Sequence, residues 1–561
     1  MIGRGRKIIL FLSLALLVCG CADGPTLYRG GTILTMDADD RVVEALLVDG
    51  DRIAAVGSEA ELRGEAGSGV RIVDLGGRTL MPGFIDGHGH FPGAGIFAIH
   101  ADLNSPPIGG VERIADIVSI FASRAANARR GSWILGLGYD DSLLAEGRHP
   151  TRSDLDLVST EHPIAAIHIS AHLAVVNSRA LSLLGIDRES RDPEGGVIRR
   201  DPSSGEPTGV LEETAAGAVI DRLQRPSFLD SIRVLRAAGK IYARAGVTTA
   251  QNGLASERQV RALNLASRLG LVPLRLVLWP DEKLADDLLR GTVRLSSYDP
   301  EWLRIGAMKL VADGSIQGYT GYLGEPYFVV PGEDPGYRGY PRMSQDALDE
   351  AVSRYHAAGL QVAIHGNGDA AIDMVLDAVE AAQSRDPRAD ARPVLVHAQM
   401  ARDDQLERMK RLGVIPSFFV LHTYYWGDRH RDVFLGPRRA MRISPTRAAV
   451  DRGLRFTLHS DTPVVPMEPL RLVWSAVNRR STSGAVIGAK QRISPLEALR
   501  AVTIDAAYQH FEENIKGSLE PGKLADLVIL SDSPLEDPEN IDKIRVEETI
   551  VAGRTVYRRS P

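Results

Sequence analysis

The sequence predicts an α/β protein: a (β/α)8 barrel with a small composite β-sandwich domain formed by the two ends of the chain. Three observations lead to this expectation. Apolar runs of strand length alternate with amphipathic helical segments through the middle of the chain, and eight such runs are present. Short strand-like runs broken by Gly and Asp turns occur near both ends.

The composition is that of an ordinary globular protein. The chain has 561 residues, 44% of them hydrophobic, a formal net charge of −6 and a pI of about 6.2. The length is sufficient for a large core and more than one domain. Because no basic run or basic patch with interleaved aromatics is present, we expect no nucleic-acid partner. The sequence does not decide between a monomer and a homodimer.

Residues 1–20 are predicted to be a signal peptide and not part of the fold. Three basic residues precede the apolar run 8–18, which has signal-peptide length and is short for a membrane span. The run ends in a pattern that resembles a bacterial lipobox, so we expect Cys21 to be lipidated; a plain secretory signal cut after Gly20 or Ala22 is the alternative. The expected location is the bacterial cell envelope, as a periplasmic or outer-membrane-anchored lipoprotein held at the membrane only by its lipid.

Both cysteines of the chain, Cys19 and Cys21, lie in or directly after this leader. The mature chain is therefore expected to contain no disulfide and no thiolate ligand. Any metal site in it has to be built from His, Asp, Glu or a modified Lys.

The predicted domains follow from the texture of the chain. Residues 25–80 and 515–561 each have too few strands for a stable sheet, so together they are expected to form the composite β-sandwich domain. Residues 81–514 are assigned to the barrel, whose eight strand runs are expected at residues 81–90, 246–253, 274–280, 303–315, 360–369, 393–399, 413–422 and 454–461. Residues 95–230 are too long for a βα loop and are predicted to form an inserted lid or substrate subdomain after the first barrel strand.

Polar side chains gather at the expected carboxyl ends of these strands, where barrel enzymes place their chemistry. The run 81–90 ends in His88 and His90, which point the same way on an extended segment because the strand period is two. The other polar residues at strand ends are Lys309, Asp313, His365, His397, His422 and Asp461. A single histidine at a strand end is more often structural, but this set on one rim suits Zn2+, with manganese or iron as other divalent candidates.

These stretches resemble the metal-dependent amidohydrolase superfamily, and within it the amidohydrolase-3 (YtcJ-like) family. The similarity lies in "GFIDGHGH", "KLVADGS", "AIHGNGD", "VHAQ" and "HSDTP", in this order, and it extends from about residue 26 to 557. The resemblance implies that one or two metal ions are held by His88, His90, Lys309, His365, His397 and Asp461. It also implies that Lys309 is carboxylated and bridges the ions if there are two; a lysine paired with Asp313, or a mononuclear site, is the alternative. Asp86 is similar to a carboxylate that orients the first two histidines.

The chain also departs from many relatives at two positions. Val396 stands where an acidic residue is common, and Asn367 stands where Ile is frequent. These differences argue against naming a substrate from the resemblance alone.

The function implied is hydrolysis of a non-peptide C–N bond in a small amide, formamide or cyclic amide. A metal-activated hydroxide would attack the carbonyl, and Asp461 would shuttle the proton to the leaving group. His397 and His422 are the other residues expected to act in catalysis. Hydrolysis of an ester, lactone or phosphoester by the same site, and a metal-binding lipoprotein without catalysis, are the alternatives.

Four further residues are candidates for contact with the substrate: His172, Asn177, Asp313 and His422. For each of the first three a packing role is the competing interpretation. Trp426 and the tyrosines beside it are expected to line a pocket wall, and Glu212 and Glu213 are interpreted as lid residues or exposed helix charges. The remaining histidines are interpreted as structural or surface residues: His100, His149, His162, His168, His356, His430, His459 and His510.

Overall fold

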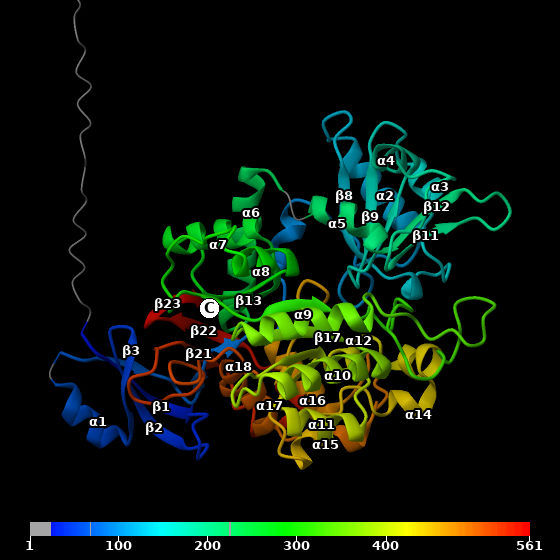
Figure 1. Ribbon diagram of the computed structural model, residues 1–561. Coiled ribbons are helices and arrows are strands. Elements are labelled where there is room, and N and C mark those ends of the chain that lie inside the picture. The colour runs from blue at the N-terminus through cyan, green and yellow to red at the C-terminus, as the bar shows by residue number, and fades with distance from the viewer. Residues whose placement is uncertain (1–23, 68, 224–225, 561) are drawn as a thin grey trace, which may run out of the picture.

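A computed structural model describes residues 24–67, 69–223 and 226–560. Three parts can be followed in Figure 1: a β domain containing both ends of the described chain, a central barrel, and a subdomain that stands apart at the upper right. Cys21 and the expected signal peptide lie outside the described residues. Within the described residues, no helix combines the length and the apolarity needed to cross a membrane.

The centre of the protein is a parallel barrel whose strands follow one another in chain order. The strands are β6 (Phe84–Ile85), β13 (Val247–Ala255), β14 (Arg275–Pro280), β15 (Leu303–Ile305), β16 (Met308–Val311), β17 (Val362–Gly366), β18 (Val394–His397), β19 (Ile415–Phe418) and β20 (Thr457–Leu458). Strands β6 to β15 pair in one parallel sheet and β16 to β20 in a second. Only two residues separate β15 from β16, and both strands lie within the predicted run 303–315.

The barrel closes where its last strand meets its first. The backbone N–H of His90 donates to the carbonyl of Thr462 at 2.8 Å, and that of Asp461 donates to the carbonyl of His88 at 3.2 Å. Every residue of β14, β17, β18 and β19 is buried, as expected of parallel strands packed on both faces. The predicted α/β barrel is confirmed, and each of the eight predicted runs contains or overlaps a barrel strand.

Helices cover the outside of the barrel, and α9, α10 and α11 are seen side by side in Figure 1. Several begin with a Ser or Asp cap, such as Ser344, whose hydroxyl accepts a hydrogen bond from the backbone of Ala347. The helices that follow the strands are α6 (Phe228–Arg244), α7 (Glu257–Arg268), α8 (Glu282–Leu289), α9 (Gln345–Ala357), α10 (Asp369–Arg385), α11 (Asp403–Leu412), α12 (His422–Tyr425), α13 (Gly427–Arg429), α14 (Gly436–Ala440), α15 (Thr446–Asp451), α16 (Pro469–Asn478), α17 (Pro495–Ala501) and α18 (Ile504–Gln509).

The segment between β6 and β13 has its own six-stranded sheet, in the order β11-β12-β10-β9-β8-β7. Its strands are β7 (Ala101–Asp102), β8 (Ile134–Tyr139), β9 (Ile164–His168), β10 (Leu173–Val176), β11 (Gly196–Arg200) and β12 (Pro207–Glu213), and its helices are α2 (Ile114–Ala125), α3 (Arg152–Asp156), α4 (Ser178–Leu184) and α5 (Gly217–Leu223). This arrangement agrees with an insertion after the first barrel strand.

The two ends of the chain share one eight-stranded sheet, ordered β23-β22-β21-β5-β1-β2-β3 with β4 beside β1. Its strands are β1 (Thr26–Leu34), β2 (Val42–Asp49), β3 (Arg52–Gly57), β4 (Arg71–Asp74), β5 (Thr79–Pro82), β21 (Leu527–Leu530), β22 (Val546–Val551) and β23 (Arg554–Arg558), with α1 (Glu59–Ala66) after β3. Strand β5 pairs with β21 across the two segments. Part of the run predicted as the first barrel strand therefore belongs to this sheet, and the barrel strand begins only after Gly83.

A buried ion pair joins this sheet to the barrel. Arg275, the first residue of β14, donates from Nε to Asp526 Oδ2 at 2.6 Å and from Nη2 to Oδ1 at 3.1 Å. The two side chains are 1% and 4% exposed. Asp526 Oδ1 also accepts from the backbone of Ala552, so the carboxylate holds both units.

Replacing Asp526 by Ala is expected to lower the free energy of unfolding by about 3–5 kcal/mol, because it leaves the Arg275 cation buried without a partner. Denaturant unfolding followed by circular dichroism measures this loss. The matched control is Glu161→Ala, which removes a solvent-exposed partner of Arg130 and should change stability little. Equal effects of the two substitutions would contradict a joining role for Asp526.

Candidate metal centre and active site

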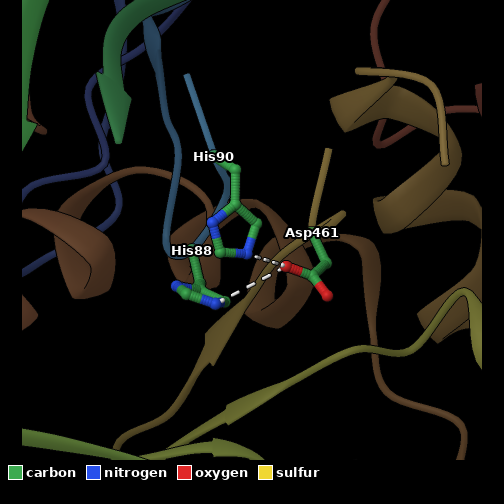
Figure 2. A group of neighbouring side chains, drawn as sticks. All are labelled: His88, His90 and Asp461. Carbon is green, nitrogen blue, oxygen red and sulfur yellow. Dashed lines mark ion pairs between the residues drawn. The ribbon is translucent and has the colours of Figure 1, made fainter. Parts of the chain in front are cut away.

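The centre of the candidate site is formed by His88 and His90 after β6 and by Asp461 after β20. Nε2 of His88 lies 3.5 Å and Nε2 of His90 3.2 Å from Oδ1 of Asp461. Figure 2 shows both imidazoles turned toward this one oxygen. One ligand atom from each residue lies within 4.8 Å of the others. The predicted His-x-His pair therefore meets the predicted aspartate.

Two glycines leave the space that Asp86 and His88 occupy. A Cβ at Gly89 would lie 2.6 Å from Asp86 Oδ2, and a Cβ at Gly253 would lie 2.0 Å from Cε1 of His88. On its other side the His88 ring stacks on Trp279, with centroids 5.4 Å apart. The backbone N–H of Gly89 donates to Gln251 Oε1 at 2.8 Å. The motif is held rigidly, as a site that must present two imidazoles to one ion requires.

The donor set fits a divalent metal ion. Oδ1 of Asp461 is buried and has no hydrogen-bond partner, which is unusual for a buried carboxylate oxygen. Burial tends to raise the pKa of Asp461, but the nearby rings of His90 and His459 and the amino group of Lys309 bring that pKa well below its ordinary value. Asp461 is thus an anion, and burial lowers the pKa of His88 so that its imidazole is neutral. Neutral imidazoles around a carboxylate are ligands that zinc prefers.

Three more predicted ligands lie around this centre. Lys309 Nζ is 3.5 Å from His88 Nε2, and burial lowers the pKa of Lys309 to about 7. The rings of His365 and His397 are 4.4 Å apart, and His397 Nε2 is 3.9 Å from Asp461 Oδ2. The structure therefore brings all six predicted metal ligands together. The alternative pairing of Lys309 with Asp313 is not observed.

The other ring nitrogen of each of these two histidines is already engaged. Nε2 of His365 lies 3.1 Å from the carbonyl of Gly314 and 2.9 Å from Asn367 Nδ2, so its Nδ1 is the nitrogen left for an ion. Nδ1 of His397 is bonded to His459, so its Nε2 is left. His397 and Asp461 both have positive φ, 73° and 54°. Such backbone conformations cost about 1–3 kcal/mol each and are common where function fixes a side chain.

The resemblance implied that Asp86 orients the two imidazoles, but the structure shows, among the residues it describes, no direct contact of this kind. The Asp86 carboxylate lies against the backbone N–H groups of His88 and Gln251, whereas Nδ1 of His88 has no hydrogen-bond partner. Burial raises the pKa of Asp86 to about 7. Asp86 therefore holds the backbone of the motif, and the ring of His88 is positioned by packing.

Asp313 organises loops and is not placed to bind substrate. Its oxygens accept hydrogen bonds from the backbone N–H groups of Tyr322, Asn367 and Gly368, each at 2.9 Å. The residue is fully buried, and burial raises its pKa to about 7. The predicted substrate role is corrected accordingly: Asp313 fixes the segments after β16 and β17.

The insertion contributes His172 to the site. The His172 ring meets the His365 ring edge-on at 5.3 Å, and its Nδ1 lies 2.8 Å from Oε2 of Glu213. Glu213 is 2% exposed, has a φ of 48° and also faces Arg342 at 3.5 Å. The interpretation of Glu212 and Glu213 as exposed helix charges is wrong, because both are buried on strand β12.

Asn177 has a structural role. Its Oδ1 accepts from the backbone of Ile164 and, as the cap of α4, from Ala180, both at 3.0 Å, and its Nδ2 donates to the carbonyls of Ser159 and His162. All its polar atoms are thus engaged within the insertion. The prediction that Asn177 contacts substrate is corrected to a capping and loop-fixing role.

His422 is near the centre but not at a strand end as predicted. Strand β19 ends at Phe418, and His422 begins the short helix α12. Its ring is 6.3 Å from that of His397 and 4.2 Å from that of Phe419, and its buried Nδ1 has no hydrogen-bond partner. Trp426, on the same turn, donates from Nε1 to Asp140 Oδ2 at 2.7 Å, which ties this wall to the insertion.

A second group in the insertion, Asp140, Asp141 and His168, also has three ligand atoms within 4.8 Å. However, the backbone of Ser170 donates to Nδ1 of His168 at 3.2 Å, so Nε2 carries the proton and faces Asp141 Oδ1 at 3.2 Å. In this group His168 and Asp141 face each other as an ion-pair contact, and Nδ1 of His168 is already engaged by Ser170.

Comparison with known proteins agrees with this geometry. The profile of the Amidohydrolase family matches residues 71–557. The chain belongs to this family. It is therefore a hydrolase of carbon–nitrogen bonds in a metal-dependent family, and its predicted membership is confirmed.

Relatives match along nearly the whole chain. An N-substituted formamide deformylase of Arthrobacter pascens is 31% identical over 94% of this chain and 97% of its own length. The putative amidohydrolase YtcJ of Bacillus subtilis is 28% identical over 95% and 99%. Among solved structures, an uncharacterised metal-dependent hydrolase from Pyrococcus furiosus is 28% identical, with a TM-score of 0.70 over 91% of this chain and 100% of the other. A similar hydrolase from Pyrococcus horikoshii OT3 is 25% identical, with a TM-score of 0.72 over 92% and 99%.

Sequence reasoning did not assign two residues to the site that the structure places beside it. Glu213 lies in "GVLEE", where two adjacent glutamates give no indication of which is buried at the site. His459 was grouped with the structural histidines, although "HSD" places it two residues before Asp461.

Proposed function

We propose that the protein hydrolyses N-substituted formamides or closely related small amides and uses Zn2+ to do so. The observation that carries the proposal is the convergence of the His88 and His90 imidazoles on the Asp461 carboxylate, where the first and last strands of the barrel meet, in a chain that belongs to the Amidohydrolase family. The formamide class is supported by the Arthrobacter relative, which matches almost end to end.

The zinc ion would be held by His88, His90, His365, His397 and Asp461. A bound zinc ion acidifies water and polarises a carbonyl group. Lys309 is proposed to carry a carbamate when a second ion binds; its buried Nζ beside His88 supports this role.

Asp461 is the group positioned to move the proton. Its Oδ1 faces both strand-end imidazoles, and its Oδ2 is directed toward His397 at 3.9 Å. It takes the proton of the attacking water as the oxygen bonds to the carbonyl carbon, and delivers it to the nitrogen as the C–N bond breaks. No serine or cysteine nucleophile is required.

His172 and His422 lie beside different histidines of this centre and would hold the substrate. His172 comes from the insertion and rests against His365. His422 rests against Phe419 and His397. The substrate class would then depend on the insertion as well as on the barrel.

Glu213→Gln is expected to lower kcat/KM for amide hydrolysis about 10-fold, because the carboxylate that orients His172 becomes a neutral amide while the metal ligands are untouched. Steady-state kinetics together with metal analysis measures this. The control is Glu212→Gln, the neighbouring residue on β12, whose carboxylate pairs with Arg199 and Tyr340. If the two variants lose kcat/KM equally, Glu213 has no special connection to the site.

A substrate panel tests the proposed activity. Purified protein without its leader, supplied with Zn2+, is offered N-alkyl and N-aryl formamides, the matching acetamides, cyclic amides, carboxylic esters and a phosphotriester. Turnover of formamides above the matched acetamides is expected. Hydrolysis of esters or phosphoesters alone would overturn the proposal in favour of another hydrolase activity, and zinc binding without turnover of any member would favour a binding protein.

The location at the bacterial envelope is a further proposal that rests on the leader sequence alone. Lipidation at Cys21 predicts that labelled palmitate enters the full-length chain and that Cys21→Ser abolishes the label. A chain that is cleaved and secreted without label would support the plain secretory signal instead.

A further inference from the structure

A continuous chain of buried hydrogen bonds runs from the segment after β6 that carries His88 to His397 at the end of β18. It begins at the carbonyl oxygen of Gly87, the residue before His88. Nε2 of Gln509, the last residue of α18, donates to this carbonyl at 2.7 Å. Oε1 of Gln509 lies 2.7 Å from Oγ1 of Thr457 on β20. Gln509 and Thr457 are both fully buried.

The chain continues through two neighbouring strands. Oγ1 of Thr457 lies 2.7 Å from Oγ of Ser417 on β19. Ser417 Oγ lies 2.9 Å from Nδ1 of His459. Nε2 of His459 lies 3.1 Å from Nδ1 of His397. Ser417 is fully buried and His459 is 1% exposed, so solvent does not replace these bonds.

The direction of every bond follows from the first one. An amide that faces a carbonyl must do so with its NH2 group, so Gln509 presents Oε1 to Thr457 as an acceptor. The Thr457 hydroxyl lies within donating distance of both Gln509 Oε1 and Ser417 Oγ, but its single proton can serve only one of them. Because the amide oxygen can only accept, that proton goes to Gln509, and the Ser417 hydroxyl must then give its proton to the Thr457 oxygen; otherwise two buried oxygens would face each other without a proton between them.

The same reasoning determines which ring nitrogen carries the proton in His459 and in His397. Since Ser417 has given its proton to Thr457, its oxygen accepts from Nδ1–H of His459. The neutral ring of His459 then has a bare Nε2, which accepts from Nδ1–H of His397. In turn, Nε2 of the neutral His397 ring carries no proton, and this is the nitrogen that faces Asp461.

We propose that Gln509, Thr457, Ser417 and His459 form a proton-ordering chain whose function is to hold His397 in the one tautomer that can bind a metal ion through Nε2. These four are positioning residues. Through this chain, the tautomer of His397 depends on the backbone carbonyl beside His88. This inference rests on the metal-dependent function proposed above, but concerns metal binding and not the substrate.

Thr457→Val tests the chain, because it removes the central oxygen and nearly preserves shape. Zinc affinity of the leaderless protein is measured by competition with a chromophoric chelator, without substrate. Affinity is expected to fall roughly 10- to 100-fold, as when other groups that orient metal-bound histidines are removed. Thr457→Ser keeps the hydroxyl and should retain the affinity of the unmutated protein. Ser417→Ala breaks the next bond and should resemble Thr457→Val.

The matched control is Thr549→Val. Thr549 is also fully buried and its hydroxyl also donates to one carbonyl, that of Ala243 at 2.7 Å, but it lies in the terminal sheet. It should leave zinc affinity unchanged. Unchanged affinity in both Thr457→Val and Ser417→Ala would overturn the proposal, and so would an equal loss in Thr549→Val.

Thermal unfolding of each variant identifies any that fails to fold. If Thr457→Val does not fold, the zinc affinity of Ser417→Ala decides whether the proposal stands. A wild-type protein that binds zinc but turns over no amide would refute the proposed activity and leave the proton-ordering chain standing.

Discussion

Asp461→Asn is expected to lower kcat for amide hydrolysis by about 10²–10⁴-fold, the usual contribution of a positioned general acid–base group. The substitution keeps the shape of the side chain and removes its charge and its ability to take a proton. Both oxygens of the carboxylate are affected: Oδ1 faces His88 and His90, and Oδ2 faces His397. Steady-state kinetics at saturating Zn2+ measures the loss.

The interpretation depends on metal content. The variant is assayed at several zinc concentrations, so that a weaker site can be filled before kcat is compared. Asp403→Asn, on the outer helix α11 where Asp403 pairs with Arg442, provides the control and should retain full activity. Full activity of a zinc-loaded Asp461→Asn protein would exclude Asp461 as the proton shuttle.

Removal of metal is expected to lower activity by at least about 10³-fold, because an ion that polarises the carbonyl and acidifies water supplies several kcal/mol of transition-state stabilisation. The loss should be reversed by Zn2+. The protein is treated with a chelator, dialysed, assayed, and assayed again after zinc addition.

Circular dichroism provides the control for this experiment. The barrel core and the closing bonds between β6 and β20 are made by the polypeptide itself, so the metal-free protein should keep its secondary structure. Activity that survives complete removal of metal would contradict the proposed chemistry.

The architecture could be predicted largely from the sequence. Buried parallel strands are read as continuous apolar runs, and the barrel requires that their carboxyl ends share one rim. For that reason His88, His90, His365, His397 and Asp461 could be expected to meet before any coordinates were known.

Other features depend on contacts that a local pattern does not contain. Glu213 is buried because the insertion folds back to Arg342 and His365, and nothing in "GVLEE" encodes that contact. Asn177 lies in a stretch similar to the family, but its amide is used fully by its own subdomain. His422 was placed on a strand because the apolar run continues past Phe418, whereas the backbone turns into α12.

The proton-ordering chain shows the same limit more clearly. Its members come from β19, β20 and α18 and from the segment after β20, and their order in space is not their order in the sequence. Ser417, Thr457 and Gln509 are types that a sequence reading passes over. Only their distances reveal the continuous path of contacts from the carbonyl of Gly87 to His397, on which the proposed proton ordering rests.

The most direct test of the central claim is the metal content of the purified, unchelated protein, determined by mass spectrometry for the wild type and for His90→Ala side by side. With zinc and bicarbonate present during expression, one or two equivalents of divalent metal are predicted in the wild type. A clear loss is predicted in His90→Ala, whose Nε2 lies 3.2 Å from Asp461. A wild-type protein without stoichiometric metal, or a His90→Ala protein with undiminished content, would contradict the assignment of His88, His90 and Asp461 as the metal centre.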